Sequence, residues 1–182
     1  QMLAKGLDLP LVTLVGVVSA DTGLYLPDFR SSERTFQVLT QVAGRAGRSL
    51  LGGRVILQTY QPDHYAIRAA SKHDHDAFYR QELRLREELR YPPFTRLVRL
   101  VYRHTSDTRA QKEATRLHGI LKTKIQSTDQ KIDLIGPAPC FFKRIRGQYR
   151  WQIILRGSDP APIVPDEFPE GWSINVDPIN LL

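Results

Sequence analysis

One run of aliphatic and β-branched residues near the start of the chain constrains its fold more than any other feature. Residues Leu11–Val18 read LVTLVGVV, which is typical of a strand buried on both faces of a mostly parallel sheet. Apolar residues at helical spacing predict a helix over Ser31–Arg45, and GRVILQTY predicts a second strand over Gly53–Tyr60. A strand, a helix and a strand joined by glycine-rich segments indicate an α/β fold for residues 1–62.

The rest of the chain has a different pattern. A charged amphipathic helix is predicted over Asp74–Tyr91, ending before two prolines because a residue that precedes proline is displaced from the helical conformation. A helix over Asp107–Gln126, flanked by short strands, then indicates an α+β domain. The expected division is therefore 1–62, a helical linker over 63–94, and the α+β domain over 95–182. The strands of this domain are expected at Thr95–His104, Ile132–Gly136, Tyr149–Leu155 and Ser173–Val176.

Two local patterns refine this expectation. Arginines interrupt the apolar residues of Thr95–His104, so that strand should be half-exposed. The stretch Asp159–Pro169 is rich in proline and cannot form a regular helix.

The charge of the chain suggests a polyanionic partner. The formal net charge is +7, and nucleic acid is the commonest partner for such an excess, although a generally basic soluble surface would give the same number. No apolar run reaches membrane-spanning length, and no signal peptide is recognisable. The single cysteine, Cys140, excludes an internal disulfide and a cysteine-based zinc site, so a reducing, cytoplasmic setting is expected. Cys140 itself should be a small buried residue.

The strongest chemical signal is the string QVAGRAGR, which begins at Gln41. Its two arginines, Arg45 and Arg48, are three residues apart at the end of the predicted helix. A guanidinium group is always charged and can fork onto phosphate oxygens, so the pair could neutralise charge on a transferred phosphoryl group. The alternative is a helix C-terminus whose arginines only offset the helix dipole.

A second signal flanks the first predicted strand. The loop AKGLDLP precedes that strand, and Ser19-Ala20-Asp21 ends it. A loop of small residues with an aspartate beside a strand end could hold a nucleotide hydroxyl or orient an arginine. The alternative is an ordinary turn between a strand and a helix.

Together these segments resemble motifs V and VI of superfamily 2 helicases. The strings AKGLDLPLVTLVGVVSAD, LYLPDFRSSERTFQVLTQVAGRAGR and GPAPCFFKRIRGQYRWQIILRG resemble one family more closely, the replication-restart DNA helicases of the primosomal protein N′ (PriA) type. This resemblance covers nearly the whole chain. It implies that residues 1–62 are the C-terminal part of a second RecA-like helicase lobe. It also implies that residues 95–182 are similar in fold to a small-subunit ribosomal protein.

The resemblance implies an activity, partners and site residues. The family is an ATP-driven 3′→5′ DNA translocase that reloads the replication machinery at stalled forks by primosome assembly. Its implied partners are branched or forked DNA, single-strand DNA-binding protein and other primosome proteins, in the bacterial cytoplasm at the nucleoid. In this sequence the resemblance assigns Arg45 and Arg48 to the ATP phosphates, Gln41 to the same cleft, Gly6 and Asp8 to ATP binding in motif V, and Lys5 to the DNA backbone.

The sequence also departs from a complete motor. No G-x-x-x-x-G-K-[ST] string occurs, and the only Asp-Glu pair, at 166–167, lies in the proline-rich stretch, so the groups that hold ATP phosphates and Mg²⁺ are expected outside this chain. The zinc-binding cysteines of the family are also missing, and His73-Asp74-His75 is too sparse to predict a metal site. We therefore expect this chain alone not to hydrolyse ATP. A free-standing nucleic-acid-binding module is the alternative function, and a ribosome-associated RNA binder is a third.

Basic and aromatic residues are interleaved over residues 141–151. Cations between aromatic rings can pair phosphates and stack on exposed bases, so this segment is a candidate DNA-binding site. In the alternative, the aromatic residues belong to the core and the arginines are merely solvated; we expect this for Phe142 and Trp151, but expect Arg144 and Arg146 to contact DNA. The full set of expected DNA contacts here is Lys143, Arg144, Arg146, Tyr149 and Arg150.

Overall fold

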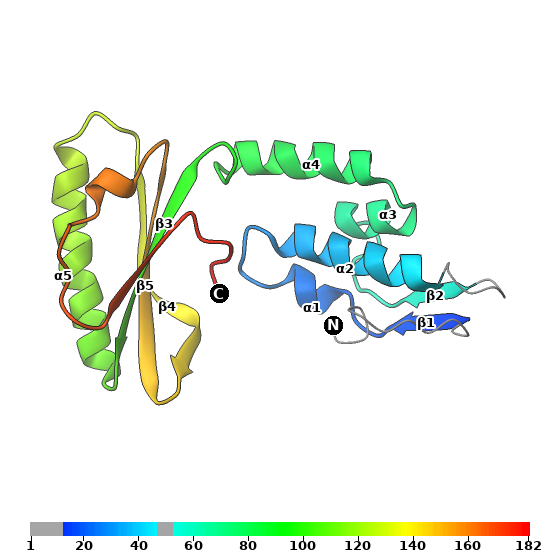
Figure 1. Cartoon of the computed structure of the whole chain (residues 1–182), viewed down its shortest axis with the longest axis horizontal. Coiled ribbons are helices and arrows are strands. Elements are labelled where there is room, and N and C mark those ends of the chain that lie inside the picture. The colour runs from blue at the N-terminus through cyan, green and yellow to red at the C-terminus, as the bar shows by residue number, and fades with distance from the viewer. Residues whose placement is uncertain (1–12, 47–52) are drawn as a thin grey trace. The chain divides into compact units, whose positions relative to one another are not determined.

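The computed structural model describes residues 13–46 and 53–182, with side chains for residues 13–44 and 53–182. The chain forms two compact units, residues 1–85 and 86–182 (Figure 1). The boundary falls within helix α4 (His75–Glu88). The expected division into 1–62, 63–94 and 95–182 stays a prediction.

The first unit contains two short strands and several helices. Strands β1 and β2 pair in parallel, with Leu14 opposite Arg54. This parallel pair, with a long helix between its strands in sequence, agrees with the expected α/β pattern. The elements are β1 (Leu14–Val17), α1 (Asp21–Leu24), α2 (Ser31–Ala46), β2 (Arg54–Leu57), α3 (Tyr65–Ser71) and the first part of α4.

Strand β1 is less buried than its sequence indicates. Its residues alternate between exposed and half-buried, and Leu14 and Val18 are 57% and 80% exposed. Within residues 13–46 and 53–85 the sheet has two strands, with α2 packed against them, so these strands are not covered on both faces. The expectation of a strand buried on both faces is therefore wrong for the part that is described.

The core of the first unit lies between its helices. Phe36 of α2 and Phe78 of α4 stack with ring centroids 4.2 Å apart, and Leu39 is buried beside them. Helix α3 adds small side chains, which allow it to approach α2 closely. The Nδ1 atom of His64 caps α3 by accepting a hydrogen bond from the Ala66 N–H. The sequence pattern does not predict α3, because its alanine-rich face is only two turns long. Its buried residues are Ala66, Ile67, Ala69 and Ala70.

The second unit is a four-stranded antiparallel sheet with a helix on one face. The strand order is β4-β5-β3-β6, and α5 packs against β3, β4 and β5 (Figure 1). The predicted α+β pattern is confirmed, including the helix at Asp107–Gln126. The elements are β3 (Arg96–His104), α5 (Asp107–Gln126), β4 (Asp133–Ile145), β5 (Gln148–Gly157), the 3-10 turn η1 (Ala161–Ile163) and β6 (Trp172–Val176).

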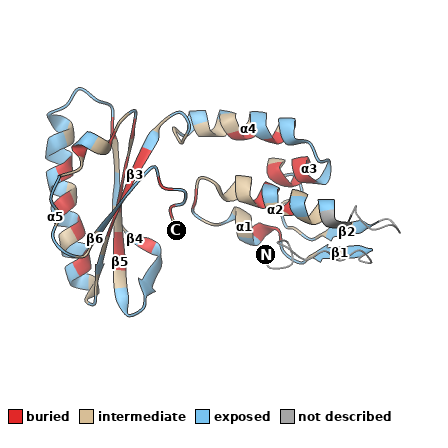
Figure 2. Ribbon diagram, viewed as in Figure 1, coloured by how far each residue is buried: buried red, intermediate tan, exposed pale blue. Residues whose placement is uncertain are grey.

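The middle of strand β3, residues 97–101, is buried on both faces, so the expectation of a half-exposed strand is wrong for this part. It lies between β5 and β6, and its side chains alternate between two covered faces. Val98 and Leu100 pack with Leu117 and Leu121 of α5. On the other face Arg99 is 6% exposed and donates hydrogen bonds to Gln152 Oε1 and the backbone oxygen of Leu182. Figure 2 shows the buried residues along α5 and the central strands.

Strand β4 is much longer than the predicted Ile132–Gly136. The strand continues through prolines at 137 and 139, because β4 is an edge strand, where a missing N–H is tolerated. Two register shifts accommodate the irregularity, one between Ile135 and Ala138 and one between Pro139 and Arg144. The proline-rich stretch forms no α-helix, as expected, and contains only η1.

None of the helices within residues 13–46 and 53–182 is long and apolar enough to cross a membrane.

Candidate functional site

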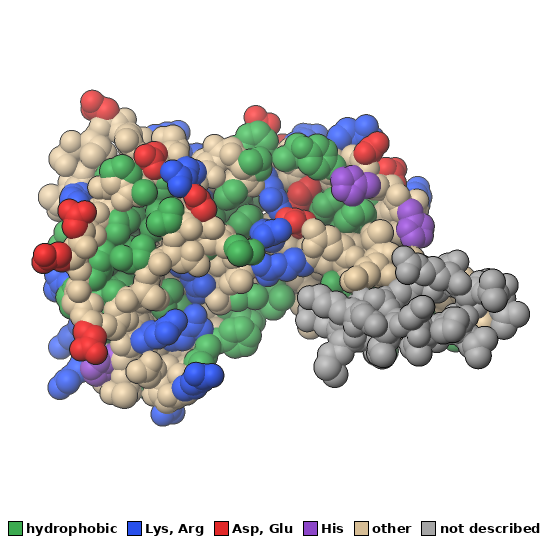
Figure 3. Space-filling model, viewed as in Figure 1, with side chains coloured by type: hydrophobic (Ala, Val, Ile, Leu, Met, Phe, Trp, Pro, Cys, Tyr) green, Lys and Arg blue, Asp and Glu red, His purple; other side chains and the backbone are tan. Residues whose placement is uncertain are grey.

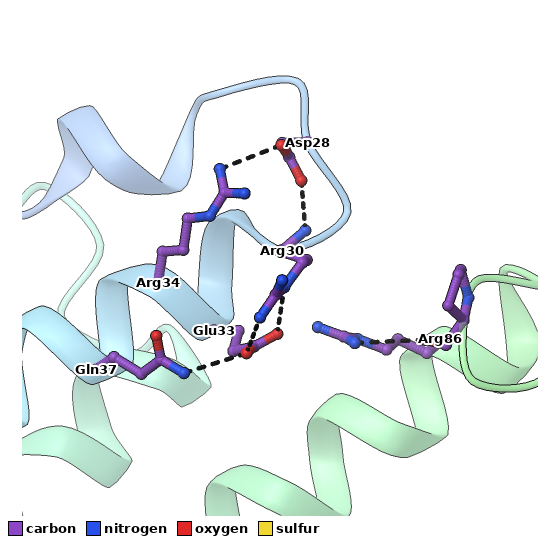
Figure 4. Close-up of polar contacts among 7 residues, drawn as sticks. Asp28, Arg30, Glu33, Arg34, Gln37 and Arg86 are labelled. Carbon is purple, nitrogen blue, oxygen red and sulfur yellow. Dashed lines mark hydrogen bonds and ion pairs between the residues drawn. The ribbon is translucent and has the colours of Figure 1, made fainter. Parts of the chain in front are cut away.

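Helix α2 carries Gln41 and Arg45, and its first turns are fixed by charged side chains (Figure 4). Arg30 donates two hydrogen bonds to the Glu33 carboxylate, at 3.0 and 2.7 Å, and Gln37 Nε2 donates a third at 3.1 Å. The buried Asp28 carboxylate accepts hydrogen bonds from the Arg30 N–H and from Arg34 Nη1. These contacts orient the helix relative to the loop that precedes it.

The far end of α2 reaches the limit of the described residues. Gln41 is exposed and lies on α2, and Arg45 lies in the last turn of the same helix. The backbone is helical through Ala46, as far as the described residues reach, and the Arg45 side chain is outside the described side chains. Arg48, Lys5, Gly6 and Asp8 lie outside the described residues altogether.

Asp21 follows β1, and its carboxylate is used within the fold. It accepts hydrogen bonds from Thr59 Oγ1 at 2.8 Å and from the Tyr60 N–H at 3.1 Å, both just beyond β2. Burial raises the pKa of Asp21, but these hydrogen bonds outweigh it and leave the pKa below its ordinary value. The bonds join the ends of the two parallel strands, so the turn interpretation accounts for this residue.

The basic segment of the second unit forms the hairpin between β4 and β5. Ile145 pairs with Gln148, and the two residues between them have positive φ, 49° at Arg146 and 80° at Gly147. Positive φ at both central positions is the signature of a type I′ turn, whose twist suits a hairpin. Arg144 and Arg146 are exposed, as their predicted role requires.

A large bulge in β4 precedes this turn. Pro139 pairs with Trp151 and Arg144 with Tyr149, so β4 places the residues 140–143 opposite Arg150 alone. Cys140 points inward and is 3% exposed, as predicted for this residue. We define the residues 140–143 as the bulge. It displays two rings, because Phe141 and Phe142 are each 51% exposed.

Phe142 therefore corrects the sequence interpretation, which placed it in the core. Its ring meets the Phe141 ring edge to face, with centroids 5.0 Å apart. The extra residues of the bulge turn this side chain away from the sheet. The alternation pattern of a regular strand cannot reveal this.

Arg150 was expected to contact DNA, but its side chain serves the bulge. The residue is 9% exposed, and its Nη1 atom donates a hydrogen bond to the Phe142 carbonyl at 3.4 Å. Its Nε atom has no hydrogen-bond partner in the described part of the chain. A side chain enclosed in this way is poorly placed to reach a phosphate.

Asp107 holds the other side of the bulge. Its carboxylate pairs with Lys143 Nζ at 2.6 Å and accepts a hydrogen bond from Trp151 Nε1 at 2.8 Å. The Lys143 contact, followed by the Trp151 hydrogen bond, lowers the pKa of Asp107. Trp151 is in the core, as predicted. The sequence pattern does not reveal this role of Asp107, because nothing in the linear order connects it with Lys143.

The ring of Tyr149 lies beside two cations, Lys143 and Arg144. Its ring lies 5.1 Å from the Arg144 guanidinium and 5.8 Å from Lys143 Nζ, and it packs against the small core around Trp151. Tyr149 is half-buried, and its contact with DNA stays a prediction. Figure 3 shows basic and hydrophobic side chains side by side at the end of this unit.

Metal ligands are not gathered in the described residues. Within 13–46 and 53–182 no group of three or more His, Cys, Asp or Glu side chains could hold a metal ion. His73 and His75 are exposed.

Comparisons with known proteins identify relatives of the chain. The family model described as primosomal protein N C-terminal domain matches residues 87–179. Replication restart protein PriA of Bacillus subtilis (strain 168) is 47% identical over 156 residues, which is 86% of this chain and 19% of that protein. The protein of the same name from Treponema pallidum (strain Nichols) is 43% identical over 193 residues, 100% of this chain and 29% of the relative. The protein of the same name from Chlamydia pneumoniae is 42% identical over 163 residues, which is 90% of this chain and 21% of the relative.

The chain thus spans between 19% and 29% of the length of these curated relatives. The family match coincides with the second unit, residues 86–182, whose sheet and helix form a complete core. By this match the chain belongs to the primosomal protein N C-terminal domain family.

Proposed function

We propose that this chain acts in replication restart as part of an ATP-dependent 3′→5′ DNA helicase that assembles a primosome at stalled forks. In this role the second unit binds branched or forked DNA, and the first unit is the C-terminal part of a second RecA-like lobe. The observation that carries the DNA-binding part is the β4–β5 hairpin. It presents Arg144 and Arg146 to solvent, with no acidic residue over 143–150.

The proposal for the first unit rests on α2. This helix ends in the string that resembles motif VI, and its first turns are held by Asp28 and Glu33. In a longer protein, Arg45 and Arg48 would approach ATP phosphates, with Gln41 in the same cleft. Gly6 and Asp8 would approach the nucleotide, and Lys5 the DNA backbone.

The sequence carries the residues expected on only one side of a nucleotide site. Asp21 is already bound to Thr59 and Tyr60, and the sequence has no phosphate-binding loop. ATP and Mg²⁺ would therefore be held mainly by residues outside this chain. We propose that the chain alone does not turn over ATP and binds no zinc.

Single-strand DNA-binding protein and primosome proteins are the proposed protein partners, in the bacterial cytoplasm at the nucleoid. The proposed likeness of the second unit to a small-subunit ribosomal protein concerns its fold only.

The alternative function is a nucleic-acid-binding module without any ATPase role. The separate core of the second unit favours it, because such a core suits a domain that acts by itself.

An ATPase measurement separates the two functions. In the longer protein that contains this segment, Arg48→Ala should abolish most DNA-stimulated ATP hydrolysis, since an arginine finger contributes about 10³-fold or more to the rate. Lys122→Ala, at an exposed lysine of α5, is the control and should leave hydrolysis unchanged. Normal hydrolysis by the Arg48→Ala protein would favour the binding module.

A further inference from the structure

Two phenylalanine rings stand half-exposed on the bulge, beside exposed cations. Phe141 and Phe142 are each 51% exposed, although burying such rings would be favourable. They contact each other edge to face, and the exposed Lys143 and Arg144 follow directly in the chain. Rings next to cations are suited to a ligand that has both flat apolar faces and negative charge.

The bulge is held in place from two directions. Arg150 donates to the carbonyl of Phe142 from inside the sheet, and Lys143 is anchored to Asp107. Asp107 is in turn bound to the indole of Trp151, a core residue. The rings are therefore displayed on a restrained backbone, which reduces the ordering cost of binding.

We propose that Phe141 and Phe142 form a stacking platform for unpaired bases of single-stranded DNA. Arg144 and Arg146 neutralise the adjoining phosphates, while Arg150, Lys143 and Asp107 are positioning residues. This inference rests on the proposed DNA-binding function and deepens it. Unpaired bases are the ligand because their faces are apolar and accessible, whereas those of a paired duplex are covered by their neighbours.

Binding titrations of the 182-residue chain test this inference. The probes are a single-stranded thymidine oligonucleotide and a blunt duplex of equal length, each labelled for fluorescence anisotropy. Phe141→Ala/Phe142→Ala should bind the single strand about tenfold more weakly, with the duplex affinity unchanged. The dependence of affinity on salt should keep its slope, because no cation is removed.

Two further variants make the result specific. Phe94→Ala removes a phenylalanine that is 45% exposed in the same unit, outside the hairpin, and should bind both probes as the wild type does. Phe141→Leu/Phe142→Leu keeps apolar area but lacks the rings, and should lose single-strand affinity as the alanine variant does. Thermal unfolding checks that each variant is folded.

A contact measurement completes the test. With 5-iodouracil in the single strand, photo-crosslinking followed by mass spectrometry should identify the peptide that contains the two phenylalanines. Wild-type affinity in the alanine variant, or full rescue by the leucines, would overturn the stacking role while leaving DNA binding intact. A wild-type chain that binds neither probe would also overturn the stacking role, and the proposed function falls only if forked DNA is not bound either.

Discussion

Arg150 is a buried cation whose hydrogen bonding is incomplete. It donates to the Phe142 carbonyl, but its Nε atom has no partner in the described part of the chain. Replacing an incompletely paired buried cation by an apolar side chain of similar length is often nearly neutral for stability. We propose that the main function of Arg150 is to hold the bulge in place.

Arg150→Met should therefore change the free energy of unfolding by less than about 1 kcal/mol. It should also weaken binding to single-stranded DNA, because the Phe141 and Phe142 rings are then held less firmly. The slope of log affinity against log salt should stay unchanged. Urea unfolding and anisotropy titrations over a range of salt concentrations measure both effects. If the slope instead falls by roughly 0.7, Arg150 contacts a phosphate directly, as the sequence alone suggested.

Asp107 gives the second unit a dependence on pH. Because Lys143 and Trp151 lower its folded-state pKa, its stabilising contribution is fully present above the pKa of an aspartate in the unfolded chain. That contribution is lost as the pH falls through the lower folded-state pKa.

Asp107→Asn should therefore be less stable than the wild type at neutral pH, and the difference should shrink in acid. Urea unfolding between neutral pH and pH 3 measures this convergence. A constant difference at every pH would show that the carboxylate charge does not stabilise the fold. Glu113 and Asp177 of the same unit also have lowered pKa values, so both proteins should keep some acid sensitivity.

At the scale of elements, the turn of the β4–β5 hairpin depends on one glycine. Gly147 has a φ of 80°, and nothing lies within 4 Å of a Cβ placed there. The cost of a side chain is thus conformational and not steric. Gly147→Ala should destabilise the second unit by about 1 kcal/mol, measured by urea unfolding. An unchanged midpoint would mean that the hairpin does not have the positive-φ turn.

Helices were the elements best predicted from the sequence. The apolar face of α5 repeats at helical spacing through Ala114, Leu117 and Leu121, all of which are buried, and its range matches the prediction. Long periodic segments carry their own signal. On α4 the pattern was less reliable, since the helix was predicted over Asp74–Tyr91 but spans only His75–Glu88.

Strand burial was predicted less well because it depends on neighbours distant in sequence. The arginines of β3 suggested exposure, yet the strand is central, and Arg99 bonds to residues of β5 and of the C-terminal end. The bulge could not be predicted at all, because it is visible only as a register shift against β5. The sequence pattern therefore located the basic segment but wrongly placed Phe142 in the core, and the DNA contact of Arg150 stays a prediction.

At the scale of the whole molecule, each unit has its own core. Phe36 and Phe78 stack in the first unit, and Leu117 and Leu121 lie in the core of the second. We expect Leu121→Ala to cost the second unit about 2–5 kcal/mol, and Phe36→Ala to destabilise the first unit by a similar amount. Amide hydrogen exchange, read separately over residues 13–85 and 86–182, should show each loss mainly in its own unit. Equal losses in both units for either variant would contradict this separation.

We propose that the exposed arginines of the hairpin, Arg144 and Arg146, bind DNA phosphates. The direct test is the salt dependence of the affinity of the 182-residue chain for forked DNA. Arg144→Ala/Arg146→Ala should weaken binding and reduce the slope of log affinity against log salt by roughly 1.8, because each lost phosphate contact removes about 0.9. Lys122→Ala/Lys124→Ala removes the same charge from exposed positions of α5 and should leave the slope nearly unchanged. Equal slope changes in the two variants would show that net charge, and not the hairpin, attracts DNA.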